Sequence, residues 1–206
     1  MKNIFMAFLF VAMVLFSGFI LAGEIIPCPI HSQGQRYTVS VTDLYGKTIL
    51  NSNTVTHAGG GVVEVLHDGG KTGLYDSMFN PTRSTDGRVF NPKLYRRPEC
   101  PFSLGSRVTY DNVTHLSTNG TVVTSSFEVF VDREMTLVTV PSGTYSVIRI
   151  VSIQRYLFGT ESGGEAVSIS YYAPKIGYSV QAQRTEKTSS KVIFDDKFLL
   201  VDYADK

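Results

Sequence analysis

Residues with the types and spacing that catalysis or metal binding requires are sparse in this chain. It has four histidines: His31, His57, His67 and His115. They lie in separate segments, without the H-E-x-x-H spacing that brings two imidazoles to one metal ion. Gly70-Lys71-Thr72 matches the end of a phosphate-binding loop, but Val65 stands where that loop needs its first glycine. We therefore predict no metal site, no cofactor and no catalytic residue.

Two further features fail as catalytic motifs. Ser142 lies in Pro141-Ser142-Gly143, which lacks the G-x-S-x-G elbow of a serine hydrolase, and is expected in a turn. Asp195 and Asp196 are neighbours in a predicted strand, so their side chains point to opposite faces and cannot share a substrate. We expect that the protein is not an enzyme. The weaker alternative is a hydrolase with His67, His115 or Asp195 as an acid–base group.

Residues 76–101 are rich in proline and in cationic side chains. The prolines are Pro81, Pro92, Pro98 and Pro101, and the arginines are Arg83, Arg88, Arg96 and Arg97. This composition predicts a long connection, with one short helix near residues 91–97. The four arginines either hold an anionic group, such as a lipid phosphate, or belong to a solvated loop that links two halves of a sheet. Charged loops are common, which favours the solvated loop.

Two segments carry apolar residues on both alternating faces, at positions 145–158 and 198–201. A sheet with one solvated face would not show this pattern, so the second face must be covered. The cover is a second sheet, the proline-rich connection or a bound apolar ligand, and cover by the protein itself is favoured. The candidates for lining a ligand groove are Tyr145, Tyr171, Tyr172 and Tyr178. Their alternative role is ordinary core packing.

These residues must be positioned by strands, because apolar residues recur at every second position along most of the chain. Tyr37, Val39 and Val41 show the alternation that is typical of a strand with one buried face. The other predicted strands cover residues 48–55, 61–67, 107–111, 126–132, 135–140, 144–158, 165–173, 178–185 and 192–203. Glycine-rich and proline-containing turns separate them. About ten short strands joined by tight turns predict an antiparallel sheet.

Residues 1–23 have the composition of a signal peptide. Lys2 precedes an apolar stretch over residues 4–21, and Ala22 and Gly23 are the small residues that signal peptidase prefers. No basic stop-transfer segment follows, so cleavage is favoured over an uncleaved anchor, and we expect no stable membrane insertion afterwards. Position 24 is Glu, so the cysteine that bacterial lipoproteins acylate is absent there.

The two cysteines, Cys28 and Cys100, remain after cleavage. In an exported chain a single pair favours a disulfide over two free thiols. A redox site would need C-x-x-C spacing, and a zinc site would need more ligands. We therefore predict a structural disulfide.

Charge and composition exclude several classes of protein. The chain has 19 Lys and Arg against 18 Asp and Glu, and loss of Lys2 with the leader gives 18 against 18. A nucleic-acid partner is excluded because it would need a basic surplus. With 43% hydrophobic and 18% charged residues, the chain is too apolar to be disordered. Residues 24–206 fit one all-β domain, with 24–102 and 103–206 as potential sub-halves.

Four segments follow one another along the chain: Gly34-Gln35-Arg36-Tyr37, Pro101-Phe102-Ser103-Leu104-Gly105, Val138-Thr139-Val140-Pro141-Ser142-Gly143-Thr144-Tyr145 and Tyr171-Tyr172-Ala173-Pro174-Lys175-Ile176-Gly177-Tyr178-Ser179-Val180. In this order they resemble uncharacterised exported proteins of Gram-negative bacteria. Those families are similar to the partly open β-barrels of the LolA and LolB lipoprotein carriers, and the resemblance implies a fold of that kind. The chain lacks both the lipidated cysteine of LolB and the long apolar helices of LolA, so the resemblance does not imply lipoprotein transport.

Together these observations predict an all-β protein. We expect a curved antiparallel sheet that forms a half-barrel or barrel-like sandwich, with one long proline-rich connection. The predicted function is that of a non-enzymatic cell-envelope protein, periplasmic or secreted. It would bind a lipid or another hydrophobic small molecule, or an envelope protein partner, on the concave face. The alternative is a protein-interaction module without a small ligand, such as an accessory subunit or an inhibitor of an exported enzyme.

Overall fold

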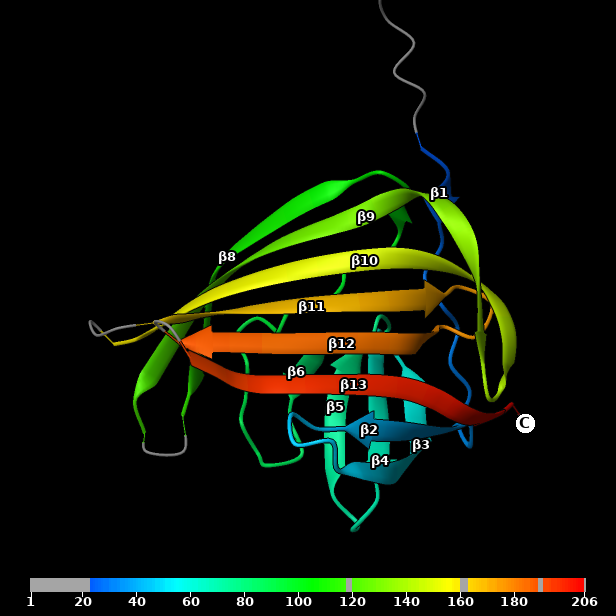
Figure 1. The fold of residues 1–206 in the computed structure, drawn as a ribbon, viewed down its shortest axis with the longest axis horizontal. Helices are drawn as coiled ribbons and strands as arrows, with labels where there is room; N and C mark the ends of the chain where they lie inside the picture. The colour runs from blue at the N-terminus through cyan, green and yellow to red at the C-terminus, as the bar shows by residue number, and fades with distance from the viewer. Residues whose placement is uncertain (1–22, 118–119, 160–162, 189–190, 206) are drawn as a thin grey trace, which may run out of the picture.

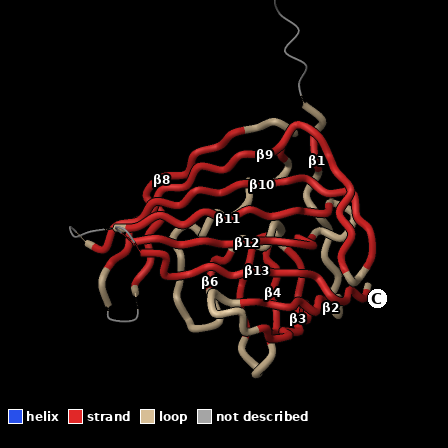
Figure 2. Tube along the Cα trace, viewed as in Figure 1, coloured by secondary structure: helices blue, strands red, loops and turns tan. Residues whose placement is uncertain are grey.

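The computed structural model describes residues 23–117, 120–159, 163–188 and 191–205; the predicted leader, apart from Gly23, lies outside these ranges. The first strands are β1 (Ile25–Ile26), β2 (Arg36–Thr42), β3 (Thr48–Gly59), β4 (Val62–His67), β5 (Thr72–Asp76), β6 (Pro81–Arg83) and β7 (Phe102–Ser103). The others are β8 (Arg107–Leu116), β9 (Val122–Val140), β10 (Gly143–Phe158), β11 (Gly164–Ala173), β12 (Tyr178–Thr188) and β13 (Lys191–Ala204). The described ranges contain strands, turns and loops but no helix (Figure 2). Accordingly, they contain no helix long and apolar enough to cross a membrane.

Eleven of the described strands form one antiparallel sheet in the order β6-β5-β4-β3-β2-β13-β12-β11-β10-β9-β8. The sheet is open, with β6 and β8 at its edges. It is also strongly curved, since β9 to β13 run side by side while β4 and β5 run across them (Figure 1). Pairing of β2 with β13 joins the beginning and the end of the described chain. The predicted all-β fold with a curved antiparallel sheet is confirmed.

Burial along the strands follows the two-residue period of the sequence. In β9, buried and partly exposed residues alternate from Val122 to Asp132, and Phe127 and Val129 face the interior. Most predicted strands are confirmed. The segments 126–132 and 135–140, predicted as separate strands, are parts of the single strand β9. The β9–β10 register shifts between Ile148 and Ile150, so this hairpin bends without interruption of either strand.

The buried residues form three apolar clusters. The Tyr37 cluster includes Tyr37, Val39, Val65, Phe79, Val147, Val180 and Leu200. The Met78 cluster includes Met78, Phe102, Val129, Ile148, Ile150 and Tyr172. The Phe90 cluster comprises Phe90, Leu94, Tyr95, Val113 and Phe127. Val147 and Ile148 are adjacent and both fully buried, but they belong to different clusters, which explains why both faces of this strand are apolar in the sequence.

The proline-rich connection, residues 77–101, packs inside the curved sheet. Met78, Phe79, Leu94 and Tyr95 are buried, and the Ser152 hydroxyl of β10 donates a hydrogen bond to the Tyr95 carbonyl at 3.0 Å. The connection therefore covers part of the concave face. The interpretation of this segment as a solvated surface loop is wrong for these residues.

The short helix predicted near residues 91–97 is also wrong. The backbone amide of Leu94 donates to the Pro81 carbonyl at 2.8 Å, and the amides of Arg96 and Arg97 both donate to Asn80 Oδ1 at 2.9 Å. These donors are used across the connection, so they are not available for helical hydrogen bonds within it.

The predicted disulfide between Cys28 and Cys100 is present. It fastens the N-terminal arm, residues 23–35, to the end of the connection, and β1 pairs with β7 beside it. Further along the arm, the ring of His31 packs edge-on against Phe79, with the ring centroids 4.6 Å apart. The arm is therefore joined to both ends of the connection, through the disulfide and through Phe79.

Candidate functional site

A cavity of about 840 Å³ lies between the curved sheet and the connection. Tyr37, Val39, Val65 and Leu200 of the Tyr37 cluster line one part of it. Phe90 and Leu94 of the Phe90 cluster line another part. No residue of the Met78 cluster lines it, because that cluster is the place where the connection packs directly on the sheet.

Strand alternation accounts for some of the residues of β11 to β13 that line the cavity, although Gln183 and Leu199, on the other alternating face, line it as well. Ser170 on β11 lies opposite Ala182 on β12, which lies opposite Phe198 on β13, and all three line the cavity. Two positions along β12, Arg184 points to the same side and lies opposite Ser168. This part of the wall is therefore polar on β11 and β12 and apolar on β13.

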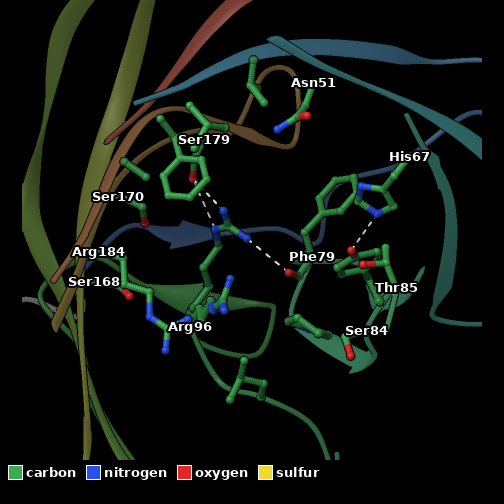
Figure 3. A pocket seen from close by; sticks show the side chains of 18 of the residues that line it. Asn51, His67, Phe79, Ser84, Thr85, Arg96, Ser168, Ser170, Ser179 and Arg184 are labelled. Atoms are coloured by element: carbon green, nitrogen blue, oxygen red, sulfur yellow. Dashed lines mark hydrogen bonds between the residues drawn. The ribbon is translucent and has the colours of Figure 1, made fainter. Parts of the chain in front are cut away.

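Two adjacent arginines enter the cavity from the connection, and only one has its guanidinium held by the protein. Arg97 Nη1 donates to the Met78 carbonyl at 2.9 Å, and its Nε and Nη2 donate to the Ser179 hydroxyl at 3.2 and 3.0 Å. The guanidinium of Arg96 has no hydrogen bond or ion pair with any described residue. In Figure 3, Arg96 lies between Arg184, Ser168 and Ser170 on one side and Phe79 and His67 on the other.

The surroundings of Arg96 disfavour its charge. Removal from water lowers its pKa to about 9, and the nearby guanidinium groups of Arg184 and Arg97 lower it in the same direction. Burial likewise lowers the pKa of Arg97. An anion placed beside the two guanidinium groups would raise their pKa values again, because an opposite charge stabilises the protonated form.

The nearest carboxylate in the cavity wall is already engaged. Glu186 accepts a hydrogen bond from Arg184 Nη2 at 2.9 Å and one from the Tyr156 hydroxyl at 2.6 Å. The lining residues that carry charge are Lys71, Arg88, Arg96, Arg97, Arg184, Asp68 and Glu186. Five cations against two carboxylates leave a surplus of three positive charges on the wall.

Three buried polar atoms of the wall have no hydrogen-bond partner among the residues that the structure describes. They are Asn53 Oδ1, His115 Nδ1 and Ser170 Oγ. Buried polar groups are normally paired, so these three atoms are exceptions to that pattern.

Of the four candidate tyrosines, only Tyr178 lines the cavity, where its ring stacks on Tyr37 with the centroids 4.2 Å apart. Tyr172 is buried in the Met78 cluster against Phe102. Tyr145 and Tyr171 pack against the Tyr37 cluster, and the Tyr145 hydroxyl donates to the Ser142 carbonyl at 3.2 Å. The structure therefore does not bring the four tyrosines to one surface, and their role in ligand binding stays a prediction.

The four candidate arginines are divided in the same way. Arg96, Arg97 and Arg88 line the cavity, but Arg88 is exposed and pairs with Asp86 at 2.8 Å. Arg83 is exposed on β6 and does not line the cavity.

Sequence reasoning missed Arg184, which joins this group from a segment more than eighty residues away. Its neighbours Gln183, Thr185 and Glu186 are polar too, so the local pattern does not tell which face of that strand is concave.

The residues of the weaker hydrolase hypothesis are spread over the structure. His67 Nε2 lies 2.8 Å from the Tyr75 hydroxyl, and both residues line the cavity. His115, on β8, packs against the ring of Phe90 in the connection. The Asp195 carboxylate accepts hydrogen bonds from Gln183 and Thr185 and does not line the cavity. Within the described ranges, no three residues among His, Cys, Asp and Glu are grouped in a way that would hold a metal ion.

No protein-family model matches the chain, and no curated protein matches it at a significant level. Solved structures do match. The hypothetical lipoprotein YmcC of Escherichia coli is 8% identical, with a TM-score of 0.51 over 84% of this chain and 86% of YmcC. A candidate lipoprotein of Parabacteroides distasonis is 10% identical, with a TM-score of 0.49 over 88% of this chain and 100% of its own.

A third match is a candidate exported protein of Bacteroides fragilis that is described as having a YmcC-like fold. It is 13% identical, with a TM-score of 0.45 over 89% of this chain and 100% of its own. At such low identities the match to YmcC shows a shared fold and nothing about function. None of the three is described as a LolA or LolB carrier, so the resemblance to those carriers stays a prediction.

Proposed function

We propose that this chain is an exported, non-enzymatic protein that binds a hydrophobic small molecule in the cavity beneath its concave sheet. The observation that supports this most strongly is the cavity itself. Its volume of about 840 Å³ lies within the range of small-molecule sites, which is about 300 to 1,000 Å³. Its wall combines apolar side chains with an about equal share of polar and charged ones, so both an apolar and a polar part of a ligand would find contacts.

Three observations support export to the periplasm or the cell exterior. Residues 1–23 have the composition of a signal peptide, and the Cys28–Cys100 disulfide is typical of an oxidising compartment. YmcC, which shares the fold, is described as a hypothetical lipoprotein. Because position 24 of this chain is Glu, we infer a released protein rather than one anchored by an acyl chain at that position.

The direct test measures binding of N-phenyl-1-naphthylamine, a neutral apolar dye, to the mature protein and two variants. Ala182 faces the cavity, so Ala182→Trp should fill part of it and weaken dye binding by about tenfold or more. Gln181 is exposed and points to the opposite face of β12, so Gln181→Trp is the matched control and should leave binding unchanged. Equal binding by both variants would contradict a site in this cavity.

A second experiment identifies the natural ligand. Native mass spectrometry of the protein from its own host, followed by lipid extraction, should show a bound apolar species that Ala182→Trp loses. If nothing apolar is bound, no lipid stabilises the protein, and an envelope protein co-purifies instead, the interaction-module alternative replaces this proposal.

A further inference from the structure

Among the described residues, Arg96 is the strongest candidate for binding a ligand group, because its donors are not used by the protein. Its guanidinium faces the cavity without a hydrogen bond or an ion pair, whereas that of the adjacent Arg97 is fixed by the Met78 carbonyl and the Ser179 hydroxyl. A guanidinium presents five donors in a planar fork that matches the oxygens of a carboxylate or a phosphate. Such a donor set with nothing to bind is a site for an oxyanion.

Among the described residues, no carboxylate forms an ion pair with Arg96, although Glu186 is near enough to raise its pKa. Glu186 is held by Arg184 and Tyr156, at 2.9 and 2.6 Å. Asp76 accepts hydrogen bonds from the Met78 and Asn80 amides, and it forms an ion pair with Lys93 at 3.0 Å. An oxyanion at Arg96 would therefore offset part of the positive surplus of the wall without displacing an existing contact.

The neighbours of Arg96 favour an anion and disfavour a cation or a neutral headgroup. Arg184 lies on the facing strand, opposite Ser168, and the unpartnered Ser170 hydroxyl is two positions further along β11. The oxyanion would thus contact the unpaired guanidinium of Arg96, the guanidinium of Arg184, which also donates to Glu186, and the hydroxyl of Ser170. Charge-assisted hydrogen bonds of this kind are about twice as strong as neutral ones.

The apolar parts of the wall favour an apolar chain attached to the anion. Val39, Val65 and Leu200 on one side and Phe90 and Leu94 on the other offer no polar side-chain atom. Free phosphate would use only the arginine end of the cavity and would leave these walls uncovered.

We propose that the cavity binds an anionic amphiphile, whose carboxylate or phosphate lies on Arg96 and Arg184 and whose alkyl chain lies along the walls formed by the Tyr37 and Phe90 clusters. This rests on the proposed function and adds the class of ligand. The shared chemistry is a singly or doubly charged oxyanion on an alkyl chain, as in a fatty acid or an alkyl phosphate.

The test compares four probes by isothermal titration calorimetry: dodecanoate, dodecyl phosphate, neutral dodecanol and inorganic phosphate. The native protein should bind at least one of the two anionic alkyl probes about tenfold or more tightly than dodecanol. Which one binds more tightly distinguishes a fatty acid from a phosphate headgroup. Inorganic phosphate should bind far more weakly than either.

The variants assign the preference to one side chain. Arg96→Gln should lose the preference for the anionic probes and keep its affinity for dodecanol, and Arg96→Lys should retain part of the preference. The matched control is Arg83→Gln, which changes an exposed arginine of the same connection and should bind like the native protein. Thermal unfolding of each variant verifies that it is folded.

Each contrary outcome has a separate meaning. If dodecanol binds as tightly as the anionic probes, or if Arg96→Gln and Arg83→Gln behave alike, this inference is wrong while the proposed function stands. If inorganic phosphate binds as tightly as dodecyl phosphate, the site takes a free anion and the amphiphile is wrong. If none of the alkyl probes binds, the proposed function itself is wrong.

Discussion

Arg96 and Arg97 are adjacent in the chain, yet one is a structural group and the other faces the cavity freely. Their different roles depend on Asn80, whose side chain is fully buried. Asn80 Oδ1 accepts both of their backbone amides, and its Nδ2 donates to Asp76 Oδ2 and to the Arg97 carbonyl at 3.1 Å. One amide side chain thus sets the backbone from which both guanidinium groups project.

Asn80→Ala should lower the free energy of unfolding by about 2 to 4 kcal/mol, because it leaves buried donors and an acceptor without partners. The midpoint of urea unfolding measures this. Asn51→Ala is the control, since Asn51 is only partly buried, and its cost should be about 0.5 kcal/mol or less. Equal costs for the two substitutions would show that Asn80 does not organise the connection.

His31 should make the protein less stable in mild acid. Burial lowers its pKa below the ordinary 6.5, so the unfolded chain binds a proton at a higher pH than the folded one. The stability that depends on neutral His31 is therefore fully present above about pH 6.5. It is lost as the pH falls from there through the folded pKa of His31. The pKa values of His67 and His115 are also lowered by burial, so their effects have the same sign.

Urea unfolding at about pH 7.5 and about pH 5.5 measures this dependence. His31→Gln should show a smaller loss between the two pH values than the native protein. A loss of the same size in His31→Gln, or a gain of stability on acidification, would rule out the contribution of His31.

At the scale of elements, the connection is the part that turns a curved sheet into a site. It covers one strip of the concave face through the Met78 cluster and leaves the neighbouring strip as a cavity. The sequence indicated the strands well, because a buried face imposes a two-residue period on Tyr37 to Val41 and on Phe127 to Val131. It also indicated the disulfide, since only Cys28 and Cys100 were available to pair.

The connection itself could not be predicted from local patterns. Its backbone donors find acceptors far away in the chain, as in the Leu94 amide with the Pro81 carbonyl, and local propensity contains no information on such contacts. The candidate tyrosines show the same limit: Tyr171 and Tyr172 are adjacent, and the register of β11 with β12 shifts between them. Alternation counted from sequence does not show such a shift.

Gly177 fixes how the turn between β11 and β12 meets the N-terminal arm. Its φ is +66°, and a Cβ there would lie 2.7 Å from Pro29 Cβ and 2.8 Å from His31 Cε1. Gly177→Ala should therefore destabilise through both backbone strain and overlap. Gly46→Ala, with a φ of +80° and open space around it, should show the backbone cost alone, about 1 to 2 kcal/mol.

Urea unfolding of the two variants gives the difference. Gly177→Ala should cost about 1 to 3 kcal/mol more than Gly46→Ala, which is typical of overpacking. If the two costs are equal, the arm moves away without penalty and does not hold the connection.

Removal of the disulfide should be costly because it closes a long loop. The two cysteines are 72 positions apart, and the chain-entropy model gives about 4 kcal/mol for such a loop. We expect Cys28→Ser combined with Cys100→Ser to unfold at a lower urea concentration by a corresponding amount. A reducing agent should lower the unfolding midpoint of the native protein and have no effect on that of the double variant. A double variant with the same midpoint as the oxidised native protein would contradict this prediction.

At the scale of the whole molecule, the open sheet encloses a cavity only because segments from distant parts of the chain meet. Arg96 comes from the connection, Arg184 from β12 and Leu200 from β13, and none is close to another in sequence. The sequence therefore indicated anion binding by Arg83, Arg88, Arg96 and Arg97 only as the less favoured alternative, and it did not indicate Arg184 on the sheet. The apolar walls followed from strand alternation, but their arrangement around a cavity did not.

The most direct test of a ligand within the molecule is the set of nuclear Overhauser contacts between ¹³C-labelled dodecanoate and the methyl groups of the mature protein. The chain methylenes should contact Val39, Val65 and Leu200, which line the cavity. Contacts restricted to Leu44 and Leu50, which are exposed at the β2–β3 hairpin, or no contacts at all, would contradict the account.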